Sequence, residues 1–377
     1  MTDLDICKEF GIPIIPGERK YWLVRTKSGV YFNDFYLNDY IAIGWDEISD
    51  ISLMTEPKRE SLVEKIKAEY DKSKNTDEED SEAKKTGNYG LIATQLIRFA
   101  TEIKKGDIVI IPSQKSNNVA FGEVLDDGIY KENIDLEDIE DTQCPFIKRR
   151  KVRWIKRQKK ESVDIYLYKL LNSHHTITDA CEYSNIIERT LNSIYVKDNV
   201  AHFTMRVGQE NNIKLKELSR LINNNISIID EFNKFTNSNL DVDDVAIKIN
   251  LHSPGPVEIE GVINGVLVIS MITFAICGGA FKFTRKNGKK ETETGLEMTS
   301  DGFMEKLIKF MDHFNNNKLE NDRLKAQLEE SRRDLRIDVP QDVIPEAVAE
   351  VVVETVEEDI SEEEIDIEVE VSEETNN

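Results

Sequence analysis

Cysteines are few in this sequence and lie too far apart for a shared role. The four of them, Cys7, Cys144, Cys181 and Cys277, form no CxxC pair. This spacing argues against a disulfide framework and against a cysteine zinc site. The opening MTDLDICKEF has acidic residues where a signal peptide requires a basic and then an apolar stretch. We therefore expect a protein of a reducing cytoplasm, with neither a metal nor a cofactor.

Signatures of catalysis are also missing. The sequence has no GxxxxGK[ST] loop, no GxSxG turn and no nuclease core of the PD-(D/E)xK kind. The histidines show no HExxH or H-x-E spacing and no metal-ligand spacing with cysteines; they are His174, His175, His202, His252 and His313. The sequence therefore predicts a protein that is not an enzyme.

Positive charge is absent from one long C-terminal stretch. Asp338 to Asn377 holds 16 Asp and Glu and no Lys or Arg, which accounts for all but 7 units of the net charge of −23. Such charge density cannot bury a core, so we expect a disordered acidic tail over residues 338–377. Its IDIEVEV segment could add as a strand to a sheet edge.

A long uncharged run stands out in this highly charged chain. Gly261 to Phe281 contains 21 residues without a charge, and basic residues follow it. About 20 apolar residues cross a bilayer as a helix, so we expect a transmembrane segment over residues 257–282 centred near Val268. Gly261 and Gly265 form a small-xxx-small pair that lets helices approach closely. The alternative is a buried core helix or a pair of core strands in an oligomer.

Residues 300–337 carry a regular seam of large side chains. Its members follow a 4,3 spacing: Phe303, Leu307, Phe310, Phe314, Asn317, Asn321, Leu324, Leu328, Ser331 and Leu335. A sustained 3.5-residue period predicts a coiled coil, and Asn321 at an a position is typical of residues that fix register. We therefore expect a homo-oligomer. An amphipathic helix packed on its own domain is the alternative.

The first 200 residues are predicted to form an α+β domain. Short β-type runs alternate with helical stretches; they are YWLVRT, YIAIGW, GDIVIIP, VAFGEVL and KVRWIK. A charged insertion is expected at residues 71–88. A connector with one helix and one strand over residues 201–256 leads to the apolar run.

The same strand series resembles the EVE family of PUA-like domains. The resemblance covers residues 18–160 and rests on YWLVRT, YFNDF, IAIGWDEI, TQLIRF, KKGDIVIIPS, AFGEV and RRKVRW in this order. Some members of that family are DNA-reading modules of modification-dependent restriction systems. The resemblance implies a small β-barrel with a pocket for a flipped base or a nucleotide, lined by aromatic and polar side chains. The charged insertion departs from compact members of the family.

Candidate ligand-binding residues fall on these strands. Nine of the thirteen residues from Lys148 to Lys160 are Lys or Arg, and Trp154 lies among them. A basic row with an aromatic side chain is typical of phosphate and base binding. A charge-protected edge strand gives the same pattern, and tryptophans also pack cores. The candidates are Trp22, Asn33, Trp45, Gln95, Arg149, Arg150, Lys151, Arg153 and Trp154.

Together these parts resemble the layout of membrane effectors in nucleotide-signalled antiphage systems, such as the Hailong type. We expect a bacterial defence effector in which a nucleotide or oligonucleotide bound by the first domain controls a membrane-disrupting oligomer. Such a protein belongs at the inner membrane, or in the cytoplasm with conditional membrane association. The alternative is a soluble reader of modified DNA. A nucleotidyltransferase partner fits the first hypothesis, and a separate nuclease fits the second.

Overall fold

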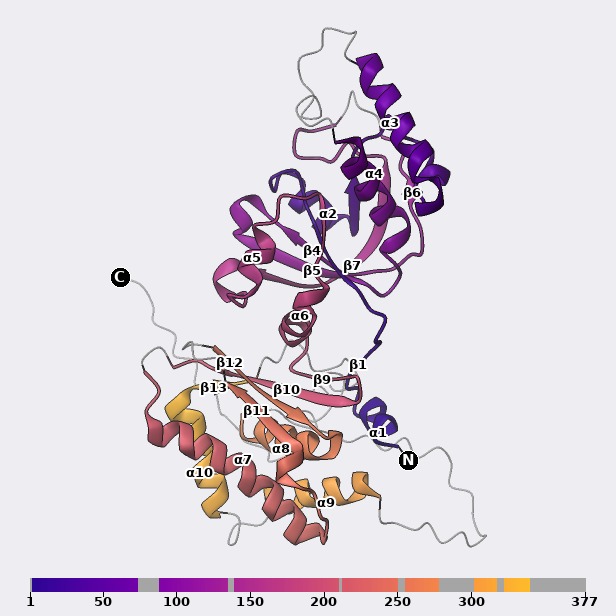
Figure 1. Ribbon diagram of the computed structural model, residues 1–377. Coiled ribbons are helices and arrows are strands. Elements are labelled where there is room, and N and C mark those ends of the chain that lie inside the picture. The colour runs from indigo at the N-terminus through magenta and orange to yellow at the C-terminus, as the bar shows by residue number, and fades with distance from the viewer. Residues whose placement is uncertain are drawn as a thin grey trace, which may run out of the picture.

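The computed structural model describes residues 2–73, 88–134, 139–209, 212–249, 255–277, 302–316 and 322–339. These residues form two lobes, each built on its own sheet (Figure 1). The fold is α+β, as the sequence predicts. Several expectations concern residues outside the described ranges: Phe281, Asn317, Asn321, most of the insertion at 71–88 and the acidic tail from 340 onward.

The first lobe contains a seven-stranded sheet. Its strand order is β3-β7-β5-β4-β2-β8, with β6 paired to β7. Only β2 and β4 pair in parallel; the other neighbours are antiparallel. The strands are β2 (Tyr21–Val24), β3 (Tyr40–Ile43), β4 (Ile108–Pro112), β5 (Asn118–Val124), β6 (Tyr130–Lys131), β7 (Lys148–Lys159) and β8 (Ile177–Asp179).

Apolar residues on both sides of this sheet give the first lobe two cores. One core packs β-sheet residues against α2, α3 and α4, and the other packs them against α5 and α6. The strands between the two cores are buried almost continuously, as their β-branched sequences predict. The helices are α2 (Phe32–Leu37), α3 (Arg59–Ser73), α4 (Tyr89–Ile97), α5 (Leu167–Leu171) and α6 (Ser184–Leu191).

The second lobe contains a six-stranded sheet. Its strand order is β1-β9-β10-β12-β11, and β13 pairs with the end of β10. The strands are β1 (Ile14–Ile15), β9 (Ile194–Lys197), β10 (Val200–Val207), β11 (Val245–Ile249), β12 (Gly255–Gly261) and β13 (Ile337–Asp338). The helices are α1 (Asp3–Glu9), α7 (Leu215–Thr236), α8 (Ile263–Ile276), α9 (Phe303–Asn316) and α10 (Asp322–Leu335).

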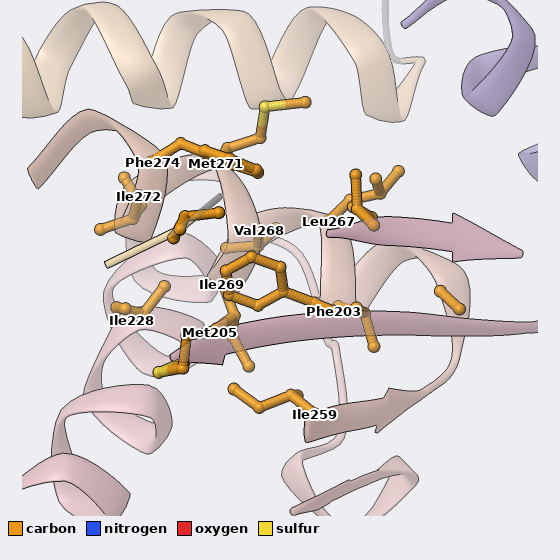
Figure 2. Close-up of a cluster of buried hydrophobic side chains, with 14 of the residues drawn as sticks. Phe203, Met205, Ile228, Ile259, Leu267, Val268, Ile269, Met271, Ile272 and Phe274 are labelled. Carbon is orange, nitrogen blue, oxygen red and sulfur yellow. The ribbon is translucent and has the colours of Figure 1, made fainter. Parts of the chain in front are cut away.

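The apolar run is the buried centre of this second lobe. Within the part of the chain that the structure describes, no helix is both long and apolar enough to cross a membrane. The described part of the run, residues 261–277, comprises the last residue of β12, Val262, the 14 residues of α8 and Cys277. Val268 is completely buried, and Figure 2 shows α8 side chains beside those of β10 and β12. The structure therefore does not support a transmembrane segment and shows the alternative of a buried core helix.

Gly261 and Gly265 permit close packing inside the chain. A Cβ at Gly261 would lie 2.2 Å from the carbonyl oxygen of Asp244, and one at Gly265 would lie 2.8 Å from Cγ2 of Val245. Both glycines therefore make room for the start of β11. In the described structure their small size serves this strand contact and not the expected contact between membrane helices.

The predicted coiled-coil seam is buried within the same chain. Its residues lie on two separate helices, α9 and α10, which both pack against α7 and α8. The ring of Phe310 meets the ring of Phe232 on α7 at 5.3 Å and a right angle. Leu307, Phe314, Leu324 and Leu328 belong to the same buried core. The described seam residues thus follow the alternative of amphipathic helices packed on their own domain.

Residues 2–15 join the second lobe and not the first. Ile6, Cys7 and Phe10 of α1 lie in the core of the second lobe, and β1 pairs in parallel with β9. The first lobe is therefore inserted between two strands of the second sheet. In Figure 1, α6 lies between the first lobe and this sheet.

Candidate ligand-binding site

A hollow on the first lobe brings together part of the predicted ligand set. It has a volume of about 490 Å³ and lies beside the first half of β7. We call it the β7 pocket, and it is lined by Asn38, Asp39, Leu125, Tyr130, Lys151, Val152, Arg153 and Trp154. An aromatic wall with cations beside it suits a planar, negatively charged ligand.

Strand alternation positions these side chains, and one irregularity follows them along β7. Along β7, Val152 is buried whereas Lys151 and Arg153 are exposed. The pairing of β5 with β7 shifts register after Trp154, between Phe121 and Gly122. Such a β-bulge redirects the side chains that follow it.

Gly122 makes room for the tryptophan. A Cβ at this position would lie 2.6 Å from Cε3 of Trp154 and 2.4 Å from Cγ1 of Val152. The indole is half-buried, and its Nε1 donates a hydrogen bond of 3.0 Å to the carbonyl oxygen of Phe35. Its ring centroid lies 5.8 Å from that of Tyr36. These contacts hold the ring in one orientation before any ligand arrives.

The cations of the pocket are held loosely. Arg153 pairs with Glu123, but the arginine side chain is 67% exposed. The ammonium of Lys151 lies 6.0 Å from the ring centroid of Tyr130. Exposed ion pairs and cation–π contacts contribute little stability, so both cations can turn to a phosphate at small cost.

A second cation–aromatic contact lies farther along the same strand. The guanidinium of Arg157 is 5.2 Å from the ring centroids of both Phe32 and Tyr36 on α2. Tyr36 also contacts Trp154, so the aromatic surface continues from the β7 pocket toward Arg157.

Two predicted phosphate-binding arginines have other contacts. The Arg150 side chain is fully buried and donates to the Asp126 carboxylate and to the carbonyl oxygens of Phe99 and Ile103. Burial lowers its pKa, while Asp126 acts in the opposite direction. Arg149 lies 4.0 Å from the Tyr40 ring and donates to two carbonyl oxygens. Both arginines therefore connect segments of the first lobe and line no part of the β7 pocket.

The other predicted residues lie away from this pocket. Trp22 is 1% exposed, and its Nε1 donates to Asp107 at 2.9 Å. Gln95 is buried, and its Oε1 accepts from the Ile177 amide at 2.6 Å. Asn33 is exposed on α2, and Trp45 is half-buried just after β3. The structure therefore brings together Lys151, Arg153 and Trp154, and it separates the remaining candidates from them.

Sequence reasoning missed Tyr130 and Asn38. Tyr130 reaches the pocket because the short strand β6 pairs with β7, with Tyr130 opposite Arg149. Asn38 follows α2, where its side chain donates to Asp34. Tyr130 belongs to no basic or aromatic cluster in the sequence, so only strand pairing reveals it; Asn38 lies in the aromatic segment from Tyr31 to Tyr40, which could have pointed to it.

One group of side chains could hold a metal ion. His202, Glu258 and Glu260 place one nitrogen and two oxygen atoms within 4.8 Å of one another on the second sheet. This group was not predicted, since its members come from two strands that are far apart in the sequence.

Comparison with known proteins identifies one segment. Residues 20–179 match a family described as a domain of unknown function, DUF8426. The matched segment runs from just before β2 to the end of β8, so it contains the β7 pocket and the whole first sheet. No curated protein and no solved structure matches the chain.

Proposed function

We propose that the first lobe is a binding module for a nucleotide or a single-stranded oligonucleotide and that the β7 pocket is its site. The observation that carries this proposal is the oriented indole of Trp154 beside the loosely held cations Lys151 and Arg153. The sequence resemblance to EVE and PUA-like domains points to the same class of ligand.

Different side chains of the pocket would contact the base and the phosphate of a nucleotide. A base stacks on an aromatic ring with little regard to its identity, and each stacked base is worth about 1–3 kcal/mol. Lys151 and Arg153 supply the positive charge for a phosphate, and Arg153 exchanges Glu123 for it. Asp39 on the pocket wall disfavours a phosphate at that end, so the base lies nearer Asp39 and the phosphate nearer Arg153.

The wider role in antiphage defence stays a prediction. It requires that a bound signal in the first lobe alter the second lobe. Both hypotheses from the sequence, an effector and a reader of modified DNA, share the binding step proposed for the β7 pocket. The membrane step of the effector hypothesis receives no support from α8, which is core.

Binding to two defined probes tests the proposal. Fluorescence anisotropy with a labelled single-stranded RNA 8-mer and calorimetry with ATP report oligonucleotide and nucleotide binding. Trp154→Ala should lower the affinity for whichever probe binds by about 5- to 150-fold, which corresponds to the loss of one stacked base. Ile155→Ala is the matched control, because Ile155 is exposed on the same strand and does not line the pocket.

Two outcomes would overturn the proposal. One is the absence of measurable binding to either probe at low salt. The other is equal affinity of wild type and Trp154→Ala, with circular dichroism showing that the variant is folded. Equal losses of affinity in Trp154→Ala and Ile155→Ala would indicate that the ligand binds on the outer face of β7 and not in the pocket.

A further inference from the structure

The two faces of the second sheet have opposite character. One face carries Phe203, Met205 and Ile259 into the apolar core of Figure 2. The other face is polar and is turned toward α6 (Figure 1). Strand pairing sets two residues of this polar face opposite one another, His202 of β10 and Glu260 of β12.

Two carboxylates converge on a single imidazole nitrogen. Nδ1 of His202 lies 2.9 Å from Oε1 of Glu258 and 3.4 Å from Oε2 of Glu260. The His202 side chain is 8% exposed, and that of Glu258 is 4% exposed. One nitrogen carries at most one proton, so His202 Nδ1 donates a hydrogen bond to one of these carboxylates, and Glu260 Oε2 also pairs with Lys248.

Unpartnered polar atoms beside this group provide a second, independent observation. Among the described residues, the Tyr195 hydroxyl and Thr204 Oγ1 are buried and have no hydrogen-bond partner. The Tyr195 ring stacks on His202 with centroids 4.7 Å apart, and Thr204 lies opposite Glu258 in the sheet. Buried groups of this kind are rare unless a water, an ion or a ligand satisfies them.

We propose that His202, Glu258 and Glu260 bind one divalent transition-metal ion of the zinc class. Imidazole and carboxylate ligands hold zinc at about 2.0–2.2 Å. Two ligands on one tetrahedral or octahedral ion are therefore about 3.0–3.5 Å apart. The separations of 2.9 and 3.4 Å from His202 Nδ1 to the two carboxylates are close to this requirement, and all three ligand atoms lie within 4.8 Å of one another. The fourth position is left for water, with Tyr195 and Thr204 as its neighbours.

The surrounding charges permit an ion to enter. Glu258 uses its second oxygen, Oε2, for the pair with Arg189, so Oε1 is free to turn from His202 to a metal. Glu260 pairs with Lys248, whose side chain is 53% exposed and can turn into solvent. Glu260 itself is 21% exposed, and this gives the ion a path from the surface.

Metal binding by the full-length chain tests this site. After treatment with a chelator and dialysis, calorimetry with Zn²⁺ should give one bound ion per chain, and thermal unfolding should shift upward with added Zn²⁺. Co²⁺ should give visible absorption bands, whereas Mg²⁺, which prefers oxygen ligands, should compete poorly.

Two variants decide whether the ion is at this place. Glu260→Gln keeps the size of a partly exposed side chain, and His202→Ala removes the nitrogen ligand; each should weaken Zn²⁺ binding by about 10-fold or more. His175→Ala is the control, because His175 is exposed on a loop. The proposal is overturned if wild type takes up no stoichiometric Zn²⁺. It is equally overturned if folded Glu260→Gln keeps wild-type affinity and cobalt bands.

Discussion

Arg189 of α6 forms an ion pair with Glu258 of β12, with Nη1 and Oε2 3.4 Å apart. The two side chains are 11% and 4% exposed, and the same guanidinium also contacts Asp164. Because α6 belongs to the core of the first lobe and β12 to the second sheet, this pair joins the two lobes. A buried charge that loses its partner is costly, so the contact fixes how the lobes dock.

Replacing Glu258 should make the free energy of unfolding less dependent on pH in the acid range. Burial by itself raises the pKa of Glu258, but the hydrogen bond and charge of His202, together with Arg189 and Lys248, hold it below the ordinary value. A carboxyl group whose pKa is lower in the folded than in the unfolded state stabilises the fold at pH values above the unfolded pKa, which is near 4.5. This stabilisation is lost as the pH falls through the folded pKa. Glu258→Gln should therefore cost about 3–5 kcal/mol at pH 7.

Denaturant unfolding at several pH values, with a chelator present, measures this effect. The difference in free energy of unfolding between wild type and Glu258→Gln should become smaller as the pH falls below the unfolded pKa of Glu258. A gap of equal size at neutral and acid pH would show that Glu258 contributes through packing and not through its charge.

Salt dependence should separate pocket cations from other basic residues of β7. Each phosphate contact to a single strand contributes about 0.7 to the slope of log affinity against log salt. Lys151→Ala should flatten the slope for the RNA 8-mer by about this amount. Lys159→Ala is the control, since Lys159 is exposed on the same strand and does not line the β7 pocket. Equal slopes for both variants and wild type would argue against a phosphate at Lys151.

Val268→Arg should unfold the second lobe in the absence of any membrane. Val268 is 0% exposed at the centre of α8, so an arginine there is a buried charge without a partner and costs several kcal/mol. Thermal unfolding in detergent-free buffer should show a large loss of stability. Unchanged stability in that buffer, with altered partitioning into vesicles, would favour the membrane hypothesis.

Charges in the former coiled-coil seam should destabilise the chain itself. Leu324 and Leu328 are 8% and 9% exposed within the core shared with α7 and α8. Leu324→Asp together with Leu328→Asp should lower the unfolding temperature at every protein concentration. Light scattering combined with thermal unfolding checks this; dissociation to a smaller species of unchanged thermal stability would support an intermolecular seam instead.

Gly261→Ala should be costly although it adds one methyl group. Gly261 has φ +155°, and its new Cβ would lie 2.2 Å from the Asp244 carbonyl oxygen, so backbone must shift. We expect a loss of about 1–3 kcal/mol in the free energy of unfolding. Gly128→Ala is the control, because no atom lies within 4 Å of the added Cβ. Equal stabilities of the two variants would contradict this role of Gly261.

The sequence predicted the α+β class, and it named three residues that line the β7 pocket because strand alternation is a local property. The alternation that exposes Lys151 and Arg153 also turns Arg150 inward beside Val152, so the burial of Arg150 was already present in the pattern. Tyr130, by contrast, reaches the site through strand pairing, and so does the group of His202, Glu258 and Glu260. Register between distant strands cannot be inferred from one sequence.

The predictions of a transmembrane segment and of a coiled coil differ from the structure for another physical reason. The hydrophobicity of a segment indicates that it is buried away from water, but it does not indicate whether lipid, another chain or the same chain covers it. Val268 meets β10 and β12 where a lipid was expected, and Phe310 meets Phe232 where a second chain was expected. The change from β12 to α8 at Gly261 involves contact with Asp244, which lies outside the run, and α8 covers only 14 of the run's 21 residues.

The insertion of the first lobe between β1 and β9 gives it two tethers. A module on one linker can swivel about that linker, whereas a module held at both ends is limited to rocking about the line that joins them. Ile14 and Val196 face each other across the parallel pair, so both tethers arise from neighbouring strands. Both connections of the first lobe therefore meet the second sheet at one place, the edge formed by β1 and β9, where α1 and β10 flank these two strands.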